Sequence, residues 1–239
     1  MLRQTSREAR LRASLQDNQV IGDNLGTLAR ILEPKNAFGF MNSATPMTGK
    51  ELAEAYKSGQ MLSDLHYKLL LQYINATGRM YLSAYAPSLH TVGGTPILPI
   101  SAKQPRQHTI EDRTYSLISS HEGNSHIMFY VPGNVTNMRE TGYIEAIWEM
   151  PLDGLWQTFF LVRQHQSLSP TQLRKVPYFS QPTSYLQTKV VKSEPSNLIF
   201  IIEPQHIVSH VAIYKRPRGT YGVNRDIMAV CWALNRGRK

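Results

Sequence analysis

The chain has 239 residues, of which 41% are hydrophobic, 18% charged and 9% aromatic, so it can bury an ordinary globular core in one large domain or two small ones. The single cysteine, Cys231, excludes an internal disulfide framework and fits a reducing compartment. The longest apolar run, residues 198–202, is too short to span a bilayer, and the polar N-terminus lacks the apolar segment of a secretory signal. We therefore expect a soluble protein that is not secreted.

The net charge of +9 is unevenly distributed along the chain. Residues 1–150 hold 14 Lys and Arg against 13 Asp and Glu, whereas residues 151–239 hold 12 against 4. A field of one sign attracts polyanions, which favours a nucleic acid or an acidic protein as partner. The alternative is a basic surface that only keeps the protein soluble.

Three regions follow one another in the predicted organisation. Residues 1–82 have a helical pattern, with a loose apolar stripe over residues 6–32 and a loop over 33–46. Residues 83–110 contain four prolines, a Gly-Gly pair and few charges, which predicts a linker or long loop. Residues 111–239 are predicted to form a β-barrel domain with a basic C-terminal segment.

The helical pattern is clearest after residue 47. Thr48 and Glu51 fit a capping box, in which the threonine hydroxyl accepts from the amide three residues on and the glutamate reaches back. We expect Gly59 to divide two helices and Gly78 to end the second. The apolar residues at helical spacing are Leu62, Leu65, Leu69 and Tyr73.

From residue 113 onward the pattern becomes that of short strands separated by turn signals, of which Asp153-Gly154 is the strongest. Residues 166–184 are predicted to be a proline-containing excursion, and residues 226–234 a last strand or a short helix. The other expected strands are residues 114–118, 125–131, 143–148, 155–163, 185–191, 198–203 and 207–214. The predicted fold is therefore α+β: a helical N-terminal region followed by an antiparallel, partly open β-barrel.

The hairpin over residues 143–163 carries two of the three tryptophans. Alternation places Ile144, Ala146 and Trp148 on one face of its first strand. On the second strand it places Trp156, Thr158, Phe160 and Val162 opposite Leu155, Gln157, Phe159 and Leu161. Because the second strand is apolar on both faces, we expect it to be a central strand, buried on one side and partly covered on the other.

Two interpretations of this aromatic hairpin stay open. The first is a plain hydrophobic core, which the apolar pattern favours. The second is a pocket that holds a cation by cation–π attraction, since aromatic and acidic residues share its strands. The candidate residues of such an aromatic cage are Tyr143, Glu145, Trp148, Glu149, Trp156 and Phe160.

The order of these features resembles the bromo-adjacent homology (BAH) domain family over about residues 113–215. The pattern Y-I-x-x-I-W-E at residues 143–149, followed by a tight turn and W-x-x-F-x-x-V-R at 156–163, is similar to the central strands of that family. Residues 186–191 and 202–211 are similar to its following strands, although Arg163 is followed by Gln164 where the family has proline. The resemblance implies a partly open barrel that recognises chromatin partners, in some members through an aromatic cage for methylated lysine.

The C-terminal part is also similar to uncharacterised, transposon-associated fungal proteins, a resemblance that implies no activity. It contains seven cations within residues 215–239, interleaved with Tyr214, Tyr221 and Trp232. Arginine forks suit phosphates and aromatic planes suit bases, so this segment is a candidate nucleic-acid surface. The alternative is a flexible basic end or a nuclear-import patch. The seven cations are Lys215, Arg216, Arg218, Arg225, Arg236, Arg238 and Lys239.

The most enzyme-like feature is the histidine pair His206 and His210. Their side chains would share a face on either a helix or a strand, as zinc ligands do, and the β-branched residues around them favour a strand. A third ligand would come from His121, His126, His165 or Glu203. The alternative is two half-buried histidines, and a solvated loop is expected for residues 121–126.

These patterns predict non-catalytic recognition of chromatin-type or nucleic-acid partners, with no cofactor and no membrane. The expected location is nuclear, otherwise cytoplasmic. The alternatives are a metal-dependent enzyme that uses His206 and His210, and an assembly domain of a mobile-element protein.

Overall fold

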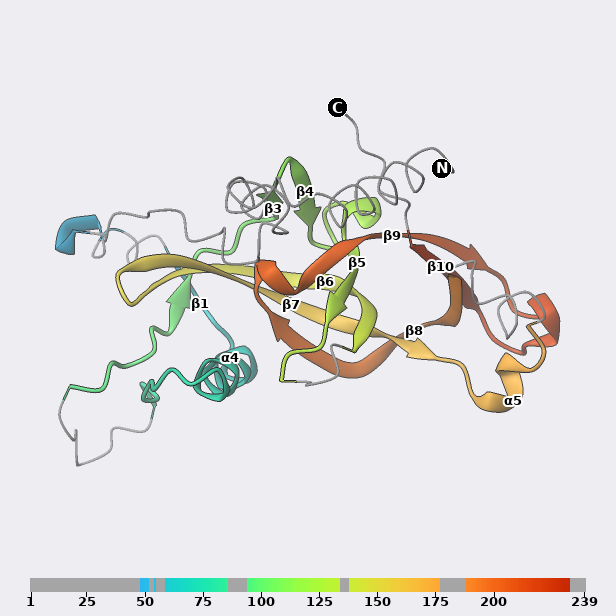
Figure 1. Ribbon diagram of the computed structural model, residues 1–239, viewed down its shortest axis with the longest axis horizontal. Helices are drawn as coiled ribbons and strands as arrows, with labels where there is room; N and C mark the ends of the chain where they lie inside the picture. The colour runs from blue at the N-terminus through green and yellow to red at the C-terminus, as the bar shows by residue number, and fades with distance from the viewer. Residues whose placement is uncertain are drawn as a thin grey trace, which may run out of the picture. The chain divides into compact units, whose positions relative to one another are not determined.

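The computed structural model describes residues 48–51, 54, 59–85, 94–133, 138–176 and 188–232, all within one compact unit formed by residues 45–239 (Figure 1). Six strands of this unit close an antiparallel barrel in the order β10-β8-β7-β6-β5-β9. They are β5 (His126–Tyr130), β6 (Arg139–Leu152), β7 (Leu155–Ser167), β8 (Thr188–Ile202), β9 (Ile207–Arg216) and β10 (Ile227–Trp232).

The predicted antiparallel barrel is confirmed, but it is closed where the sequence predicted it to be partly open. The last segment, predicted as either a strand or a short helix, is strand β10 and pairs with both β8 and β9. Each of the six strands pairs with two neighbours over part of its length, which closes the barrel.

The remaining described elements are short, apart from one helix, α4 (Asp64–Ala76). The short ones are β1 (Gln60–Met61), β2 (Ser101–Ala102), β3 (Gln107–Ile110), β4 (Arg113–Ser116), α5 (Pro170–Leu173) and the 3₁₀ turns η3 (Glu122–Asn124), η5 (Pro204–His206) and η6 (Thr220–Gly222). The helices predicted over residues 6–32 and the loop over 33–46 lie outside the described residues. Within the described residues, no helix has the length and apolarity needed to cross a membrane.

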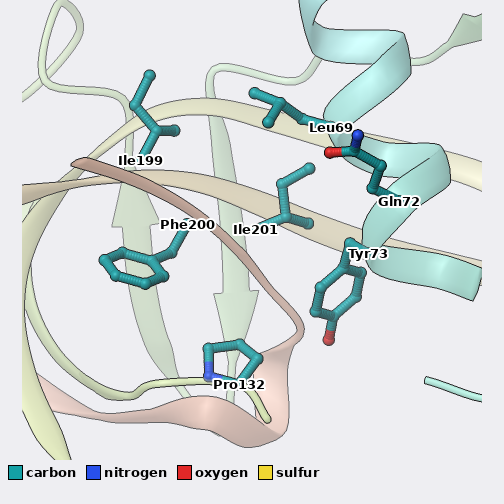
Figure 2. A pocket seen from close by; sticks show the side chains of 7 residues that line it. All are labelled: Leu69, Gln72, Tyr73, Pro132, Ile199, Phe200 and Ile201. Carbon is teal, nitrogen blue, oxygen red and sulfur yellow. The ribbon is translucent and has the colours of Figure 1, made fainter. Parts of the chain in front are cut away.

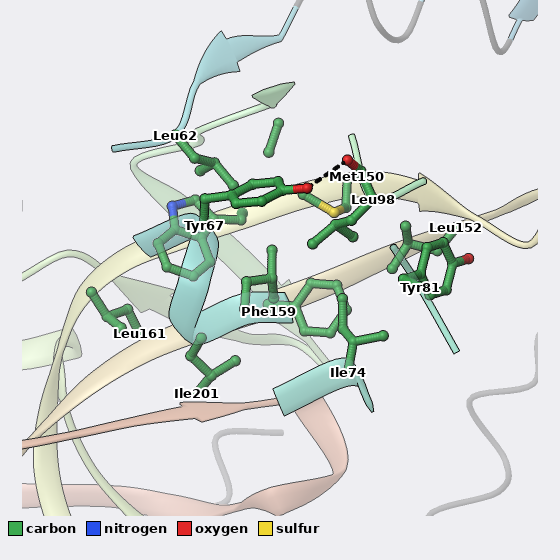
Figure 3. Packing of buried hydrophobic residues seen from close by; sticks show 13 residues of the cluster. Leu62, Tyr67, Ile74, Tyr81, Leu98, Met150, Leu152, Phe159, Leu161 and Ile201 are labelled. Carbon is green, nitrogen blue, oxygen red and sulfur yellow. Dashed lines mark hydrogen bonds between the residues drawn. The ribbon is translucent and has the colours of Figure 1, made fainter. Parts of the chain in front are cut away.

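Helix α4 packs one face against the barrel (Figure 3). Its buried side chains are Tyr67, Leu70 and Ile74, and the Tyr67 hydroxyl donates to the carbonyl of Leu98 at 3.0 Å. The stripe predicted for this helix is confirmed in part: Leu69 and Tyr73 are partly buried against the same cluster, whereas Leu65 is 60% exposed. Spacings of three and four residues fit several stripes on one helix, and only the packed partner selects among them.

Local signals at the helix ends are confirmed. Thr48 and Glu51 make both bonds of the predicted capping box, and Gly78 follows the last turn of α4 with a φ of 88°. Gly59 lies outside a helix, and strand β1 follows it directly.

A first hydrophobic cluster joins parts of the chain that the sequence assigned to different regions. Leu70 of α4, Leu98 and Ala102 pack with Trp148 of β6 and Phe159 of β7. The boundaries predicted at residues 82/83 and 110/111 thus fall inside one packed unit, because the segment predicted as a linker supplies core side chains.

The long hairpin of β6 and β7 turns at Asp153 and Gly154, whose φ values of 53° and 77° are those of a type I′ turn. This turn confirms the prediction. On β7, Phe159 and Leu161 belong to the first cluster, whereas Phe160 and Val162 belong to a second cluster with residues of β5 and β8. The central position and opposite faces predicted for this strand are therefore confirmed.

The face predicted for β6 is wrong at Ile144, whereas Ala146 and Trp148 share the first cluster as predicted. The register between β6 and β7 shifts between Ile144 and Ala146, so Glu145 occupies a β-bulge. One inserted residue moves every side chain beyond it to the other face. Ile144 therefore packs in the second cluster and Trp148 in the first, although strict alternation had put them together.

The strands predicted at residues 185–191 and 198–203 are parts of one strand, β8, within the described residues. Pro195 lies in the middle of β8 at a place where its register with β7 is irregular, and a bulge is where a strand tolerates a proline.

Candidate functional site

The four rings of the predicted aromatic cage lie in separate places. Trp148 and Phe160 have no exposed surface, and they belong to different clusters on the two sides of the hairpin. Tyr143 is half-buried beside His126, with ring centroids 5.7 Å apart, and only Trp156 is exposed, at 42%. The bulge at Glu145 explains part of this separation, because it turns Trp148 toward α4.

The two glutamates of the predicted cage are held by other side chains of the same chain. Glu145 accepts from the Arg163 guanidinium through both oxygens, at 2.5 and 3.0 Å, and this bond raises the pKa of Arg163. Glu149 lies 2.9 Å from the His108 ring, a contact that lowers the pKa of Glu149. The Lys103 ammonium lies 4.3 Å from the ring centroid of Trp156. Cation–π attraction thus does occur on this hairpin, with a lysine of the same chain.

His206 and His210 take up separate structural roles. His206 ends η5, where its ring accepts from the backbone amide of Glu203 at 3.2 Å. His210 lies on β9, stacked on Tyr115 with ring centroids 4.3 Å apart. Burial lowers the pKa of both histidines. In the described part of the chain, no three His, Cys, Asp or Glu residues form a group that could hold a metal ion.

A buried pair of histidines was missed by the sequence analysis. His126 Nδ1 lies 3.0 Å from His165 Nε2, and His165 Nδ1 lies 3.0 Å from the hydroxyl of Thr141. Both rings are almost fully buried, so the solvated loop predicted for residues 121–126 is wrong at His126. The apolar run 127–131 signals burial for its neighbour His126, but no local pattern identifies a partner 39 residues away.

Beyond the first two hydrophobic clusters, the barrel has a fourth and a third, the third formed by Met128, Val191, Val211, Met228 and Val230. The fourth hydrophobic cluster determines which cations gather at one end of the barrel. Leu168 and Val176 flank α5 and pack against Val190 of β8, Val223 and Ile227 of β10. The ammonium of Lys175 reaches the carbonyl of Gly222 at 3.2 Å, which links α5 to η6. Figure 1 shows α5 beside the β9–β10 connection at this end.

We call the cations of this end, together with the ring of Tyr214, the basic platform. Residues 169–176, 188–194 and 212–227 hold eight Lys and Arg against two acids, Glu194 and Asp226. Lys189 and Lys215 pair elsewhere, with Glu140 at 3.1 Å and Glu122 at 2.6 Å. The other six form the platform: Arg174, Lys175, Lys192, Arg216, Arg218 and Arg225.

Of the predicted C-terminal cations, Arg216, Arg218 and Arg225 belong to this platform. Arg216 lies over Tyr214, and Arg218 donates to Asn224 at 2.5 Å. Arg225 forms an exposed ion pair with Glu194 at 3.4 Å, and Lys215 lies outside the platform. Arg236, Arg238 and Lys239 lie outside the described residues. Arg174, Lys175 and Lys192 were not predicted, because their contribution depends on packing far from residues 215–239.

A pocket of about 280 Å³ lies between α4 and β8 and contains no residue of the predicted sites (Figure 2). At its rim the Tyr73 hydroxyl donates to Glu203 at 3.1 Å, and burial raises the pKa of Tyr73. The remaining lining is mostly apolar: Leu69, Gln72, Pro132, Ile199, Phe200 and Ile201.

Comparisons with protein-family models, curated proteins and solved structures find no match for this chain.

Proposed function

We propose that this protein is a non-catalytic recognition module that binds the phosphate backbone of a nucleic acid with the basic platform. The observation that carries the proposal is the fourth cluster, which packs α5 against β8 and β10 and so adds Arg174 and Lys175 to the cations of β8 and the β9–β10 connection. Six cations gathered from three segments, with two acids among them, form a local field that attracts a polyanion.

The platform can exchange its internal contacts for phosphates at small cost. The ion pair of Arg225 and Glu194 is exposed, and exposed pairs contribute little to stability. Within the described residues, Arg174, Lys192, Arg216 and Arg218 form no ion pair with an acidic side chain. Guanidinium groups also match the geometry of phosphate oxygens.

Salt dependence tests this proposal. Binding of the full chain to a nucleic acid should weaken steeply with salt, with a slope of log K against log salt of about −4 to −5 if all six cations contact phosphate. Replacing Arg174 and Lys192 together by alanine should reduce the size of the slope by about 1.5 to 2. Fluorescence anisotropy with labelled oligonucleotides between 50 and 300 mM salt, to order of magnitude the range where screening changes most, gives both values.

The matched control is Lys68→Ala, since Lys68 is an exposed cation on α4. This variant should keep the wild-type slope. A slope near zero for the wild-type protein would overturn the proposal, and so would equal losses in the platform variant and the control.

A second candidate function, chromatin-type recognition with a nuclear location, is supported by the contact between Lys103 and Trp156. The ring of Trp156 already holds an ammonium group at 4.3 Å, so its face suits a cation. Lys103→Ala should therefore strengthen binding of a histone peptide with methylated lysine, and Trp156→Ala should abolish it. Titration of such peptides by calorimetry checks both, and equal affinities in all three proteins would refute this candidate.

A further inference from the structure

Strand pairing on the basic platform arranges its side chains in rows across three strands. Arg216 of β9 is opposite Ile227 of β10, which is opposite Lys192 of β8. Two residues further along, Tyr214 is opposite Ala229. Because paired residues share a face of a sheet, Tyr214, Ala229 and the two cations lie on one face, with the buried Ile227 between Arg216 and Lys192.

Tyr214 is exposed over 59% of its surface, although it lies on a strand of the barrel. The guanidinium carbon of Arg216 lies 4.3 Å from the ring centroid, so a cation holds the ring in place. An ordered, exposed aromatic ring next to phosphate-binding cations is the arrangement on which unpaired bases stack.

The connection from β9 to β10, beside this surface, is held by hydrogen bonds. The backbone amide of Arg218 donates to Asp226 at 2.7 Å, and the Gly219 amide donates to the Val223 carbonyl at 2.9 Å. Tyr221 in this connection has a φ of 55°, a left-handed conformation that is costly for an aromatic residue. The packing of Tyr221 against the fourth cluster maintains this conformation, so the connection is ordered before any ligand binds.

We infer that the basic platform prefers single-stranded over duplex nucleic acid, with Tyr214 as the residue on which a base stacks. This inference rests on the proposed function, since it requires that the platform bind phosphates. In a duplex the base faces are stacked on one another, and a tyrosine on a sheet surface reaches only the backbone. In a single strand the base faces are available, and aromatic stacking adds to the phosphate contacts without requiring a particular sequence.

The test compares one oligonucleotide sequence as a single strand and as a duplex, at one salt concentration, with the full chain. The wild-type protein should bind the single strand about tenfold more tightly. Tyr214→Ala should weaken binding of the single strand by about tenfold and leave binding of the duplex unchanged. Tyr214→Phe keeps the ring and should retain the wild-type preference.

Arg218→Ala is the matched control for a phosphate contact, and it should weaken both forms to a similar degree. Equal binding of the two forms, with Tyr214→Ala affecting neither or both alike, would overturn the inference and leave the proposed function standing. Failure of the wild-type protein to bind either form in a salt-dependent way would overturn the proposed function itself.

Discussion

Gly142→Ala should destabilise the protein by about 3 kcal/mol, the upper part of the range for an overpacked interior. A Cβ atom added at Gly142 would lie 2.8 Å from the Val162 side chain and closer still to the backbone carbonyl oxygen of Arg163. That oxygen belongs to the paired strand β7, so relief requires β6 and β7, two neighbouring strands of the barrel, to separate. Thermal unfolding followed by circular dichroism should show a loss of about 10 °C for a body of this size.

Gly49→Ala is the matched control for this substitution, since an added Cβ there meets no atom within 4 Å. It should leave the melting temperature unchanged or slightly raised, because alanine is the better helix former. A melting temperature of Gly142→Ala within about 2 °C of the wild-type value would contradict the close approach of β6 and β7.

The close approach at Gly142 matters for the polar groups on either side of it. Thr141 precedes it and meets the ring of His165 at 3.0 Å, while Glu145, three residues further on, pairs with Arg163. Both contacts join β6 to β7. The glycine therefore sets the distance at which two buried or half-buried polar contacts form, and we expect its substitution to disturb them together.

Features of the fold that depend on neighbours in the sequence could be predicted. Asp153-Gly154 specifies its turn because few other residue pairs tolerate two successive positive φ values. The two faces of β7 could be predicted from strict alternation, because its pairing with β6 is regular from Ala146 to Leu152. Antiparallel architecture follows from short strands joined by such turns.

Features that depend on distant partners could not be predicted. The bulge at Glu145 inserts one residue without any glycine or proline to signal it, and that residue reversed the predicted neighbours of Trp148. Pro195 lies between the two strands predicted at residues 185–191 and 198–203 but is part of β8, since irregular pairing with β7 removes the need for its missing amide. Leu65 and Leu69 fit a helical stripe as well as Tyr67, Leu70 and Ile74 do.

The candidate site also combines a feature that could be predicted from the sequence with one that could not. The sequence reveals an excess of cations in the last third of the chain, and the structure retains Arg216, Arg218 and Arg225 in one platform with Tyr214. Arg174 and Lys175 join them only through the packing of Leu168 and Val176, which lie among residues that have the pattern of a loop. A surface assembled by tertiary packing has no signature in any single segment.

The buried pair of His126 and His165 has a consequence for stability at acid pH. Burial lowers the pKa of His126 to about 4 and that of His165 to about 3, from the usual 6.5. Nearby cations, Lys215 beside His126 and Lys189 beside His165, lower these pKa values further, and Glu122 opposes them at His126. Both histidines are therefore neutral in the folded protein at pH 5, whereas both are charged in the unfolded chain.

Since the folded pKa values lie below the unfolded value, the unfolded chain takes up protons first as the pH falls through 6.5. The free energy of unfolding then decreases until His126 titrates near pH 4 and His165 near pH 3 in the folded protein. From pH 7 to pH 5 the pair should lower the free energy of unfolding by about 3 kcal/mol, and urea unfolding at pH 7, 6 and 5 measures this loss. A variant that carries His126→Gln and His165→Gln should lose most of that dependence, because amides do not titrate. His121→Asn, a change at an exposed histidine that caps η3, should keep the wild-type dependence. If the double variant and the wild-type protein lose equal free energy between pH 7 and pH 5, the pair is not buried as a neutral unit, and the contact of 3.0 Å between the rings is wrong.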